Sequence, residues 1–402
     1  MTSIFSDALH EQLGTWPLAY IPYGGADFGE IQSIAQAVGN GDDNTFYTAW
    51  TEAAERMMAE GRTAESHGRR ISAHESYLRA ACFYSKAYPP LFGYPVDPRV
   101  IEASRRQIDA FNLALALRED PVEPVRIPFE TSSMLAYVIP AEGRASERRP
   151  LLIVTNGYDA SITDPFFASV VAASRRGYHC LIFDGPGQGT TLVEQGIPLR
   201  ADWETVVNAV VDFALTLPNV DPDRIALSGW SLGGYLAPRG ASGEPRLAAC
   251  IADPAQSCIA DGFRAYAIKL GATPEEAAQL GSLPEEFIGR MQDIIARDRK
   301  LHWSVVQRGY WVNGAKNLRD YLACVEHFTM AGRIENIQCP TLFTLAENDP
   351  LASGTQAFFD ALRCPTKTLL RFSSAQGAGD HCEMGNRSLL NRSVLDWLDE
   401  VL

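Results

Sequence analysis

The stretch 224–234 constrains the fold of this 402-residue chain more than any other part of its sequence. An apolar run, 225–227, leads into Gly-Trp-Ser-Leu-Gly with Ser231 at its centre, and a further glycine follows at Gly234. Glycines two residues on either side of a serine suit a tight turn from a buried strand into a helix, because side chains there would clash. The pattern therefore predicts an α/β protein in which Ser231 stands exposed at a sharp bend.

Short apolar runs alternate with helical patterns from about residue 121 onward. Strands are expected at 125–130, 134–139, 151–154, 180–183, 224–228, 247–252, 340–345 and 367–372, with helices opening near Asp164, Trp203 and Ser388. Such alternation predicts a mostly parallel sheet with helices on both faces. The interval 256–338, between the sixth and seventh strands, is helical in pattern and too long for an ordinary connection. It predicts an inserted lid over the strand ends.

The first 120 residues show helical periodicity instead. Phe46, Trp50 and Ala54 follow one another at helical spacing after Asp43, which we expect to cap that helix. Asp97 followed by proline predicts a further helix start, since proline is favoured in the first turn. The chain therefore divides into an N-terminal helical domain, 1–120, and an α/β domain, 121–402, which carries the insertion at about 256–338.

The charge balance argues against two classes of partner. Lys and Arg number 35 against 49 Asp and Glu, a formal net charge of -14, so phosphate backbones and anionic lipid are repelled. With no run of about 18 apolar residues either, the sequence predicts neither nucleic-acid nor membrane partners. Scattered cysteines, and a start that lacks a basic segment followed by an apolar run, predict a cytoplasmic protein with reduced thiols. No metal-ligand spacing occurs, so we expect no metal and no cofactor.

A serine becomes a nucleophile when a histidine removes its proton and a carboxylate orients that histidine. His381 lies in a glycine-rich loop after the last strand, where it can reach across the sheet edge to Ser231, and it is the expected base. Asp349, after the strand 340–345, is the expected acid. Asp253 is its rival, because the end of the preceding strand could also present a carboxylate to the histidine.

Backbone amides near the serine are expected to hold the negative oxygen of a tetrahedral intermediate. The predicted donors are the N–H of Leu232 and the N–H of Tyr158, which lies in the loop after the strand 151–154. Gly157 would let that loop approach closely. We also expect Gly157, Trp230 and Asp253 to contact substrate.

Two other segments bear on this site. The glycine-rich stretch 184–191 lacks the ending of a phosphate-binding loop and predicts a turn beside the site. Pro238 cannot donate a helical hydrogen bond, so it should kink the helix after the serine and free the carbonyl of Gly234.

These features resemble the α/β-hydrolase superfamily, and within it the branch with an N-terminal helical cap domain that includes dihydroxypseudooxynicotine hydrolase. Fungal polyketide-shortening hydrolases and acylaminoacyl-peptidase-like proteins are similar. The segments 229–234, 244–251 and 379–382 carry the resemblance. It implies Ser231 as nucleophile, His381 as base and Asp349 as acid, a cap role for 1–120, and a homodimer.

The sequence thus predicts a serine hydrolase that acts on a small carbonyl compound. The resemblance favours hydrolysis of a C–C bond, in a ketone or β-diketone, or of an ester, in a bulky aromatic or polyketide-like molecule. Three alternatives stay open: an acylaminoacyl- or dipeptidyl-type peptidase, an acyltransferase that uses the same residues, and a non-catalytic binding module. The complete set of serine, histidine and aspartate disfavours the last.

Overall fold

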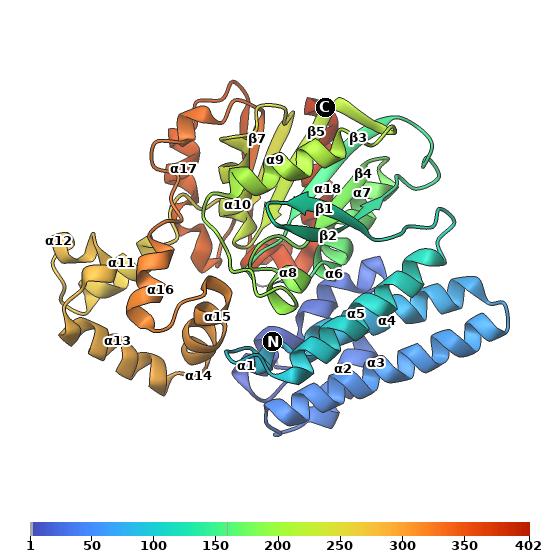
Figure 1. The fold of residues 1–402 in the computed structure, drawn as a ribbon, viewed down its shortest axis with the longest axis horizontal. Coiled ribbons are helices and arrows are strands. Elements are labelled where there is room, and N and C mark those ends of the chain that lie inside the picture. The colour runs from blue at the N-terminus through green and yellow to red at the C-terminus, as the bar shows by residue number, and fades with distance from the viewer. Residues whose placement is uncertain (1–2, 159) are drawn as a thin grey trace.

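The centre of the protein is a single twisted sheet, drawn in Figure 1 from a computed structural model that describes residues 3–158 and 160–402. Its order is β1-β2-β4-β3-β5-β6-β7-β8, in which β2 is antiparallel to β1 and β4 and the other neighbours are parallel. The mostly parallel α/β architecture predicted from the sequence is confirmed. The strands are β1 Val125–Phe129, β2 Ser132–Ile139, β3 Arg149–Thr155, β4 His179–Phe183, β5 Val220–Trp230, β6 Ala249–Asp253, β7 Thr341–Ala346 and β8 Lys367–Phe372.

Successive residues of the central strands face opposite cores. Leu151 and Ile153 of β3 pack in the same cluster as Trp203, whereas Leu152 and Val154 pack in the cluster that contains Leu398. The helices α9 (Trp203–Ala214) and α10 (Gly233–Ala241) cover one face of the sheet, and α18 (Arg387–Val401) lies on the other (Figure 1). A strand that is buried on both faces is apolar along most of its length, and β3 and β4 can therefore be recognised in the sequence as continuous apolar runs.

Two strand boundaries differ from the prediction. β5 begins at Val220, four residues early, and Val220 pairs with Arg149 of β3 ahead of a register shift. Polar residues inside this early part hide it from a search for apolar runs. β6 begins at Ala249 and not at Leu247, because the N–H of Leu247 turns back to the carbonyl of Glu244, 3.4 Å away.

The N-terminal region is helical, as predicted, and its long helices run beneath the sheet in Figure 1. Asp97 caps its helix by accepting from the N–H of Arg99 at 2.9 Å, as expected. The prediction for Asp43 is wrong by one residue: Asp42 accepts from the N–H of Thr45 at 3.0 Å, and Asp43 instead binds buried His10. The elements are α1 Ala8–Gly14, η1 Trp16–Tyr23, α2 Phe28–Val38, α3 Asp43–Ser66, α4 Arg70–Ala87, η2 Pro89–Leu91 and α5 Pro98–Ala116.

The helix after β3 does not begin with Asp164 as a cap. It comprises α6 (Thr163–Pro165), a π-helical segment η3 (Phe166–Val170) and α7 (Val171–Arg175), and Asp164 already lies inside its first turn. The carboxylate of Asp164 is buried and points to the N-terminal region instead. Gly177, with φ of 92°, ends this helical stretch as predicted.

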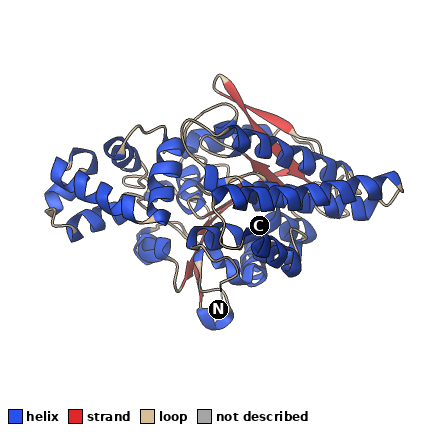
Figure 2. Cartoon of the chain, turned by 90° about the horizontal axis from the view of Figure 1, so that it is seen from below, coloured by secondary structure: helices blue, strands red, loops and turns tan. Residues whose placement is uncertain are grey.

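The insertion between β6 and β7 is helical, and it has a hydrophobic cluster of its own that includes Leu280, Ile288 and Leu322. It also contacts the N-terminal region: Trp303 stacks on Phe92 and donates to the carbonyl of Pro89 at 2.8 Å. In the view from below, helices cover most of the sheet (Figure 2). The insertion contains α11 Asp261–Lys269, α12 Pro274–Ala277, η4 Leu280–Ser282, α13 Glu285–Arg297, α14 Arg299–Leu301, π-helical η5 His302–Gly309, α15 Tyr310–Asn313 and α16 Leu318–Val325.

A buried polar network joins the N-terminal helices to the loop that follows β3. Lys86 of α4 forms an ion pair with Asp164, and Tyr20 of η1 donates to the same carboxylate at 3.1 Å. The other oxygen of Asp164 accepts from the hydroxyl of Ser161 at 3.0 Å, and Gln107 of α5 donates to Ser161 at 2.8 Å. Because these groups are withdrawn from water, their pairing is strongly coupled to the packing of the two regions.

Lys86→Ala should lower the free energy of unfolding by about 3–5 kcal/mol, because Asp164 would stay buried without a counter-charge. Urea denaturation followed by circular dichroism measures this loss. The double variant Lys86→Met/Asp164→Asn should recover part of it. Arg290→Ala breaks an exposed pair with Glu286 and should cost at most about 0.5 kcal/mol. A loss in Lys86→Ala no larger than in Arg290→Ala would contradict the expectation.

Candidate active site

Ser231 occupies the bend between β5 and α10 in a strained backbone conformation. Its φ is 56°, a left-handed value that serine rarely adopts. A side-chain carbon on Gly229 would lie 2.1 Å from the carbonyl oxygen of Gly233, and one on Gly234 would lie 1.8 Å from that of Pro254. The glycines of this segment are therefore required by backbone-to-backbone contact, as the sequence predicted.

Backbone carbonyls at the start of α10 accept hydrogen bonds from a residue that closely follows β6. Pro238 lies within α10 and leaves the carbonyl of Gly234 without its helical partner, as expected. The N–H of Gln256 takes that place at 3.1 Å, and the side-chain amide of Gln256 donates to the carbonyl of Ser231 at 2.7 Å. The N–H of Ser231 in turn donates to the carbonyl of Asp253 at 2.7 Å. The bend is thus tied to β6 on both sides of the serine.

Ser231, His381 and Asp349 form a hydrogen-bonded set. His381 Nε2 is 3.0 Å from Ser231 Oγ, and His381 Nδ1 is 2.7 Å from Asp349 Oδ2. The second oxygen of Asp349 accepts from the N–H of Leu351 at 2.9 Å, which orients the carboxylate. The side chain of Asp349 is 1% exposed and that of His381 is 27% exposed. The structure brings together the three residues selected from the sequence, and a solvent path reaches the imidazole.

The rival carboxylate, that of Asp253, is bonded to residues other than the histidine. Its Oδ1 accepts from the hydroxyl of Thr344 at 2.8 Å, and its Oδ2 accepts from Arg387 at 2.8 Å. Asp253 is 4% exposed. Of the two acids that the sequence left open, Asp349 contacts His381, and the buried pairing of Asp253 does not favour contact with substrate.

The loop after β3 packs directly against Ser231. A side-chain carbon on Gly157 would meet Ser231 Cβ at 3.0 Å, so the expected close approach is present. Asn156 holds this loop by accepting from the N–H of Gly157 at 3.0 Å and from Trp230 Nε1 at 2.9 Å. Gln188 donates to the carbonyls of both Asn156 and Gly157. Trp230 is therefore a buried support of the loop as well as a neighbour of the serine.

The predicted turn at 184–191 lies beside the site and ends in a short helix, α8 (Gly189–Val193). Its Asp184 is completely buried and accepts from the N–H of Thr190 at 2.8 Å. Burial raises the pKa of Asp184 to about 7. This segment supports the loop after β3 through Gln188, which precedes α8.

Tyr158 connects the same loop to the insertion. Its ring lies 4.6 Å from the guanidinium of Arg308, which also lies 4.8 Å from the ring of Trp303. The side-chain amide of Asn313 donates to the Tyr158 hydroxyl. The backbone N–H of Leu232 lies where α10 begins, and the residue after Tyr158 lies outside the described part of the chain. The side chain of Tyr158 thus anchors the loop while its backbone lies next to Gly157.

Trp16 is a neighbour of the site that the sequence did not reveal. It belongs to η1, and its ring centre is 6.3 Å from that of His381 and 5.4 Å from that of Trp230. Nothing in a lone tryptophan near the N-terminus indicates this position, because only the fold brings the two regions together. The N-terminal region therefore forms part of the wall of the site.

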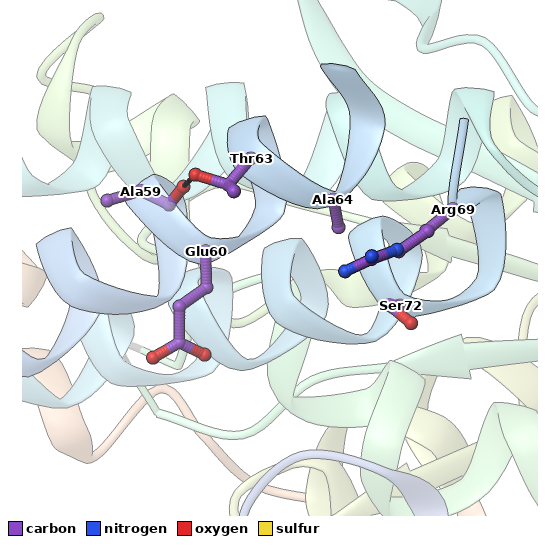
Figure 3. A pocket seen from close by; sticks show the side chains of 6 residues that line it. All are labelled: Ala59, Glu60, Thr63, Ala64, Arg69 and Ser72. Carbon is purple, nitrogen blue, oxygen red and sulfur yellow. Dashed lines mark hydrogen bonds between the residues drawn. The ribbon is translucent and has the colours of Figure 1, made fainter. Parts of the chain in front are cut away.

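Two surface depressions lie elsewhere, on the N-terminal helices. One of about 310 Å³ lies between α3 and α4 and is lined by residues from Ala59 to Ser72 (Figure 3). The other, of about 350 Å³, includes Tyr84 and Arg106. Neither is lined by a residue of the candidate site. Among residues 3–158 and 160–402, no helix combines the length and apolar character needed to cross a bilayer.

Comparison with known proteins identifies the family. The sequence profile of the Alpha/beta hydrolase family matches residues 151–384. The chain is 30% identical to Hydrolase LUC6 of Fusarium sp over 402 aligned residues, covering 95% of this chain and 94% of the relative. It is also 30% identical to the 20-hydroxy-prefusarin hydrolase FUS2 of Gibberella moniliformis, with 95% and 94% covered.

Among solved structures, the crystal structure of a 2,6-dihydroxy-pseudo-oxynicotine hydrolase superposes with a TM-score of 0.74 at 22% identity, covering 96% of this chain and 95% of that one. This likeness concerns the fold, including the N-terminal helical region. Because the family profile matches more than half of the chain, and a relative is 30% identical over nearly its whole length, the protein belongs to the alpha/beta hydrolase family.

Proposed function

We propose that this protein is a serine hydrolase that cleaves a C–C bond or an ester in a bulky aromatic or polyketide-like carbonyl compound. The observation that carries the proposal is the 3.0 Å separation between Ser231 Oγ and His381 Nε2, with Asp349 bonded to the other ring nitrogen. A serine hydroxyl within hydrogen-bond reach of an oriented imidazole is the arrangement that activates a nucleophile.

The reaction begins when His381 Nε2 accepts the proton of Ser231 as Oγ attacks the carbonyl carbon. Asp349 accepts a hydrogen bond from the Nδ1–H of His381, which holds the required tautomer and stabilises the imidazolium that forms. The negative oxygen of the tetrahedral intermediate is held by the N–H groups of Leu232 and Tyr158. Preorganised donors of this kind add stabilisation that grows as the charge develops.

Collapse of the intermediate expels the leaving group, to which the imidazolium delivers its proton. Water, deprotonated in turn by His381, then releases the acyl group from Ser231. When carbon leaves, it must leave as a stabilised carbanion such as an enolate, whereas an alkoxide leaves an ester without that help. The partly exposed ring of Trp16, centred 6.3 Å from that of His381, offers aromatic surface near the reacting atoms, which favours a large conjugated substrate over a short aliphatic one.

A substrate screen with esters, anilides and β-diketones, run on the wild type and on Ser231→Ala, tests the bond type. Turnover of β-diketones or bulky esters is the expected result. Preferential cleavage of aminoacyl anilides would instead identify a peptidase. Product that appears only when an amine or alcohol acceptor is added would identify an acyltransferase.

Cellular location and assembly complete the proposal. All eight cysteines are free thiols. This supports a cytoplasmic location, where thiols stay reduced. The homodimer implied by the resemblance stays a prediction, which light scattering at several protein concentrations would test.

A fluorophosphonate probe should label the protein once, at Ser231. Ser231→Ala should abolish labelling and lower kcat by at least roughly a thousandfold, because no other hydroxyl of the described residues is hydrogen-bonded to His381 Nε2. The control Ser66→Ala removes an exposed hydroxyl on α3 and should change neither quantity. Labelling that persists in Ser231→Ala would remove the proposed mechanism.

Asp349→Asn should lower kcat by about 10⁴-fold without unfolding the protein, because the amide cannot hold His381 in the required tautomer. Asp253→Asn should chiefly lower thermal stability, because it weakens a buried pair with Arg387. Steady-state kinetics and a melting curve on both variants separate these effects. A greater loss of kcat in a folded Asp253→Asn protein would reverse the assignment of the acid.

Gly157→Ala should lower kcat by roughly a hundredfold, because the new methyl group would push the loop away from Ser231 and displace the amide of Tyr158. Gly289→Ala, in a helical position with open space around it, is the matched control and should leave kcat unchanged. The two variants are compared by kcat and by fluorophosphonate labelling rate. Equal activity in both would show that the close approach at Gly157 does not matter for the reaction.

A further inference from the structure

Glu383 is a buried acid that the reaction itself does not use. It follows His381 by two residues, and its side chain is fully excluded from solvent, at 0% exposure. Both Cys382 and Glu383 adopt left-handed backbone conformations, with φ of 53° and 48°. Within the described part of the chain, neither carboxyl oxygen of Glu383 accepts a hydrogen bond from any donor. A buried carboxylate in that situation would carry a large desolvation cost.

The group that faces Glu383 is another carboxyl group, that of Asp253 at the end of β6, within hydrogen-bond reach. The nearby Arg387 of α18 directs its Nη1 elsewhere, donating to Asp253 Oδ2 at 2.8 Å and to the carbonyl of Cys382 at 2.7 Å, so it acts on Glu383 only through its charge. Two adjacent buried carboxylates that share the charge of a single nearby guanidinium cannot both be ionised at low cost. A single proton shared between them removes the repulsion and supplies the missing donor.

We propose that Glu383 is kept as a neutral carboxylic acid, that it donates its proton in a hydrogen bond to Asp253, and that this bond positions the His381 loop against Ser231. The catalytic consequence rests on the proposed function, whereas the protonation does not. Glu383 touches no reacting atom and is a positioning residue.

The proposed hydrogen bond closes a chain of contacts between the two halves of the site. His381 and Glu383 lie on the same short segment, η9 (His381–Asn386), and Asp253 accepts from the N–H of Ser231 at 2.7 Å through its backbone carbonyl. The thiol of Cys382 is 3.6 Å from the same carbonyl. One residue, Asp253, is thereby bonded to the bend that carries the nucleophile and to the loop that carries the base.

The surrounding charges favour the neutral form of Glu383. Burial is the largest cause that raises its pKa, to about 11, and the negative charges of Asp253 and Asp349 add to it, while Arg387 opposes them. The thiol of Cys382, whose pKa burial also raises, carries no charge at neutral pH. From η1, which packs against this loop, Tyr20 and Tyr23 bring phenols that bond to Asp164 and Asn391.

Proton release on unfolding tests the protonation state without any substrate. In the folded protein Glu383 holds its proton, and in the unfolded chain it ionises above its ordinary pKa of 4.5. Unfolding between pH 6 and pH 9 therefore releases one proton, so the contribution of Glu383 to stability falls as pH rises. The unfolding constant of the wild type should rise tenfold per pH unit more steeply than that of Glu383→Gln.

Urea unfolding at several pH values, followed by circular dichroism, gives these slopes. The control Glu335→Gln, at an exposed position, should keep the wild-type slope. Parallel slopes for the wild type and Glu383→Gln would overturn the proposal. If Glu383→Gln does not fold, infrared spectroscopy of the wild type at pH 9, well above the pKa of about 7 that burial gives Asp184, decides instead. The carbonyl band of a protonated carboxyl is then expected, and its absence would overturn the proposal.

Kinetics test the positioning role. Glu383→Gln keeps a donor toward Asp253 and should retain kcat within about threefold, whereas Glu383→Leu removes the donor and should lower kcat by roughly a hundredfold with KM unchanged. A Glu383→Leu protein that folds with wild-type kcat would overturn the positioning role. If the wild type hydrolyses nothing, the proposed function fails, and the unfolding slopes still decide the protonation of Glu383.

Discussion

The site depends on the backbone contact between the bend at Ser231 and the end of β6. The carbonyl of Pro254 lies where a side chain on Gly234 would be, and the carbonyl of Asp253 accepts from the N–H of Ser231. A side chain at position 234 would separate the bend from the end of β6, and Ser231 would then no longer be held in its left-handed backbone conformation. The position of the Ser231 hydroxyl is thus set by main-chain packing, while the side chain remains free to reach His381.

The N-terminal helices are part of the site's construction and more than a cover. Lys86, Tyr20 and Gln107 reach Asp164 and Ser161 beneath the loop that carries Gly157 and Tyr158. Tyr158 itself is held from the other side by residues of the insertion. The loop after β3 is thus held by two helical regions that are remote from it in sequence.

Several buried acids lie around the candidate active site, and each offsets the free-energy cost of its burial through different partners. Asp164 has a lysine, Asp253 has an arginine and a threonine, and Asp349 has a histidine and a backbone N–H. In the described part of the chain no cation forms an ion pair with Asp184 or Glu383, and burial raises the pKa of both. Burial and the nearest hydrogen-bond partners therefore determine which of these acids is ionised.

The strands, the bend and the candidate residues Ser231 and His381 could be predicted from the sequence, because buried parallel strands are continuously apolar and the bend needs glycine at particular spacings. The sequence left Asp349 and Asp253 as rivals, since both follow a strand and only the direction of each side chain separates them. It also placed one helix cap at Asp43 and one at Asp164, where long-range partners, His10 and Lys86, take those carboxylates. The positions of Trp16 and Glu383 beside the site could not be predicted, because they depend on neighbours that no local sequence pattern encodes.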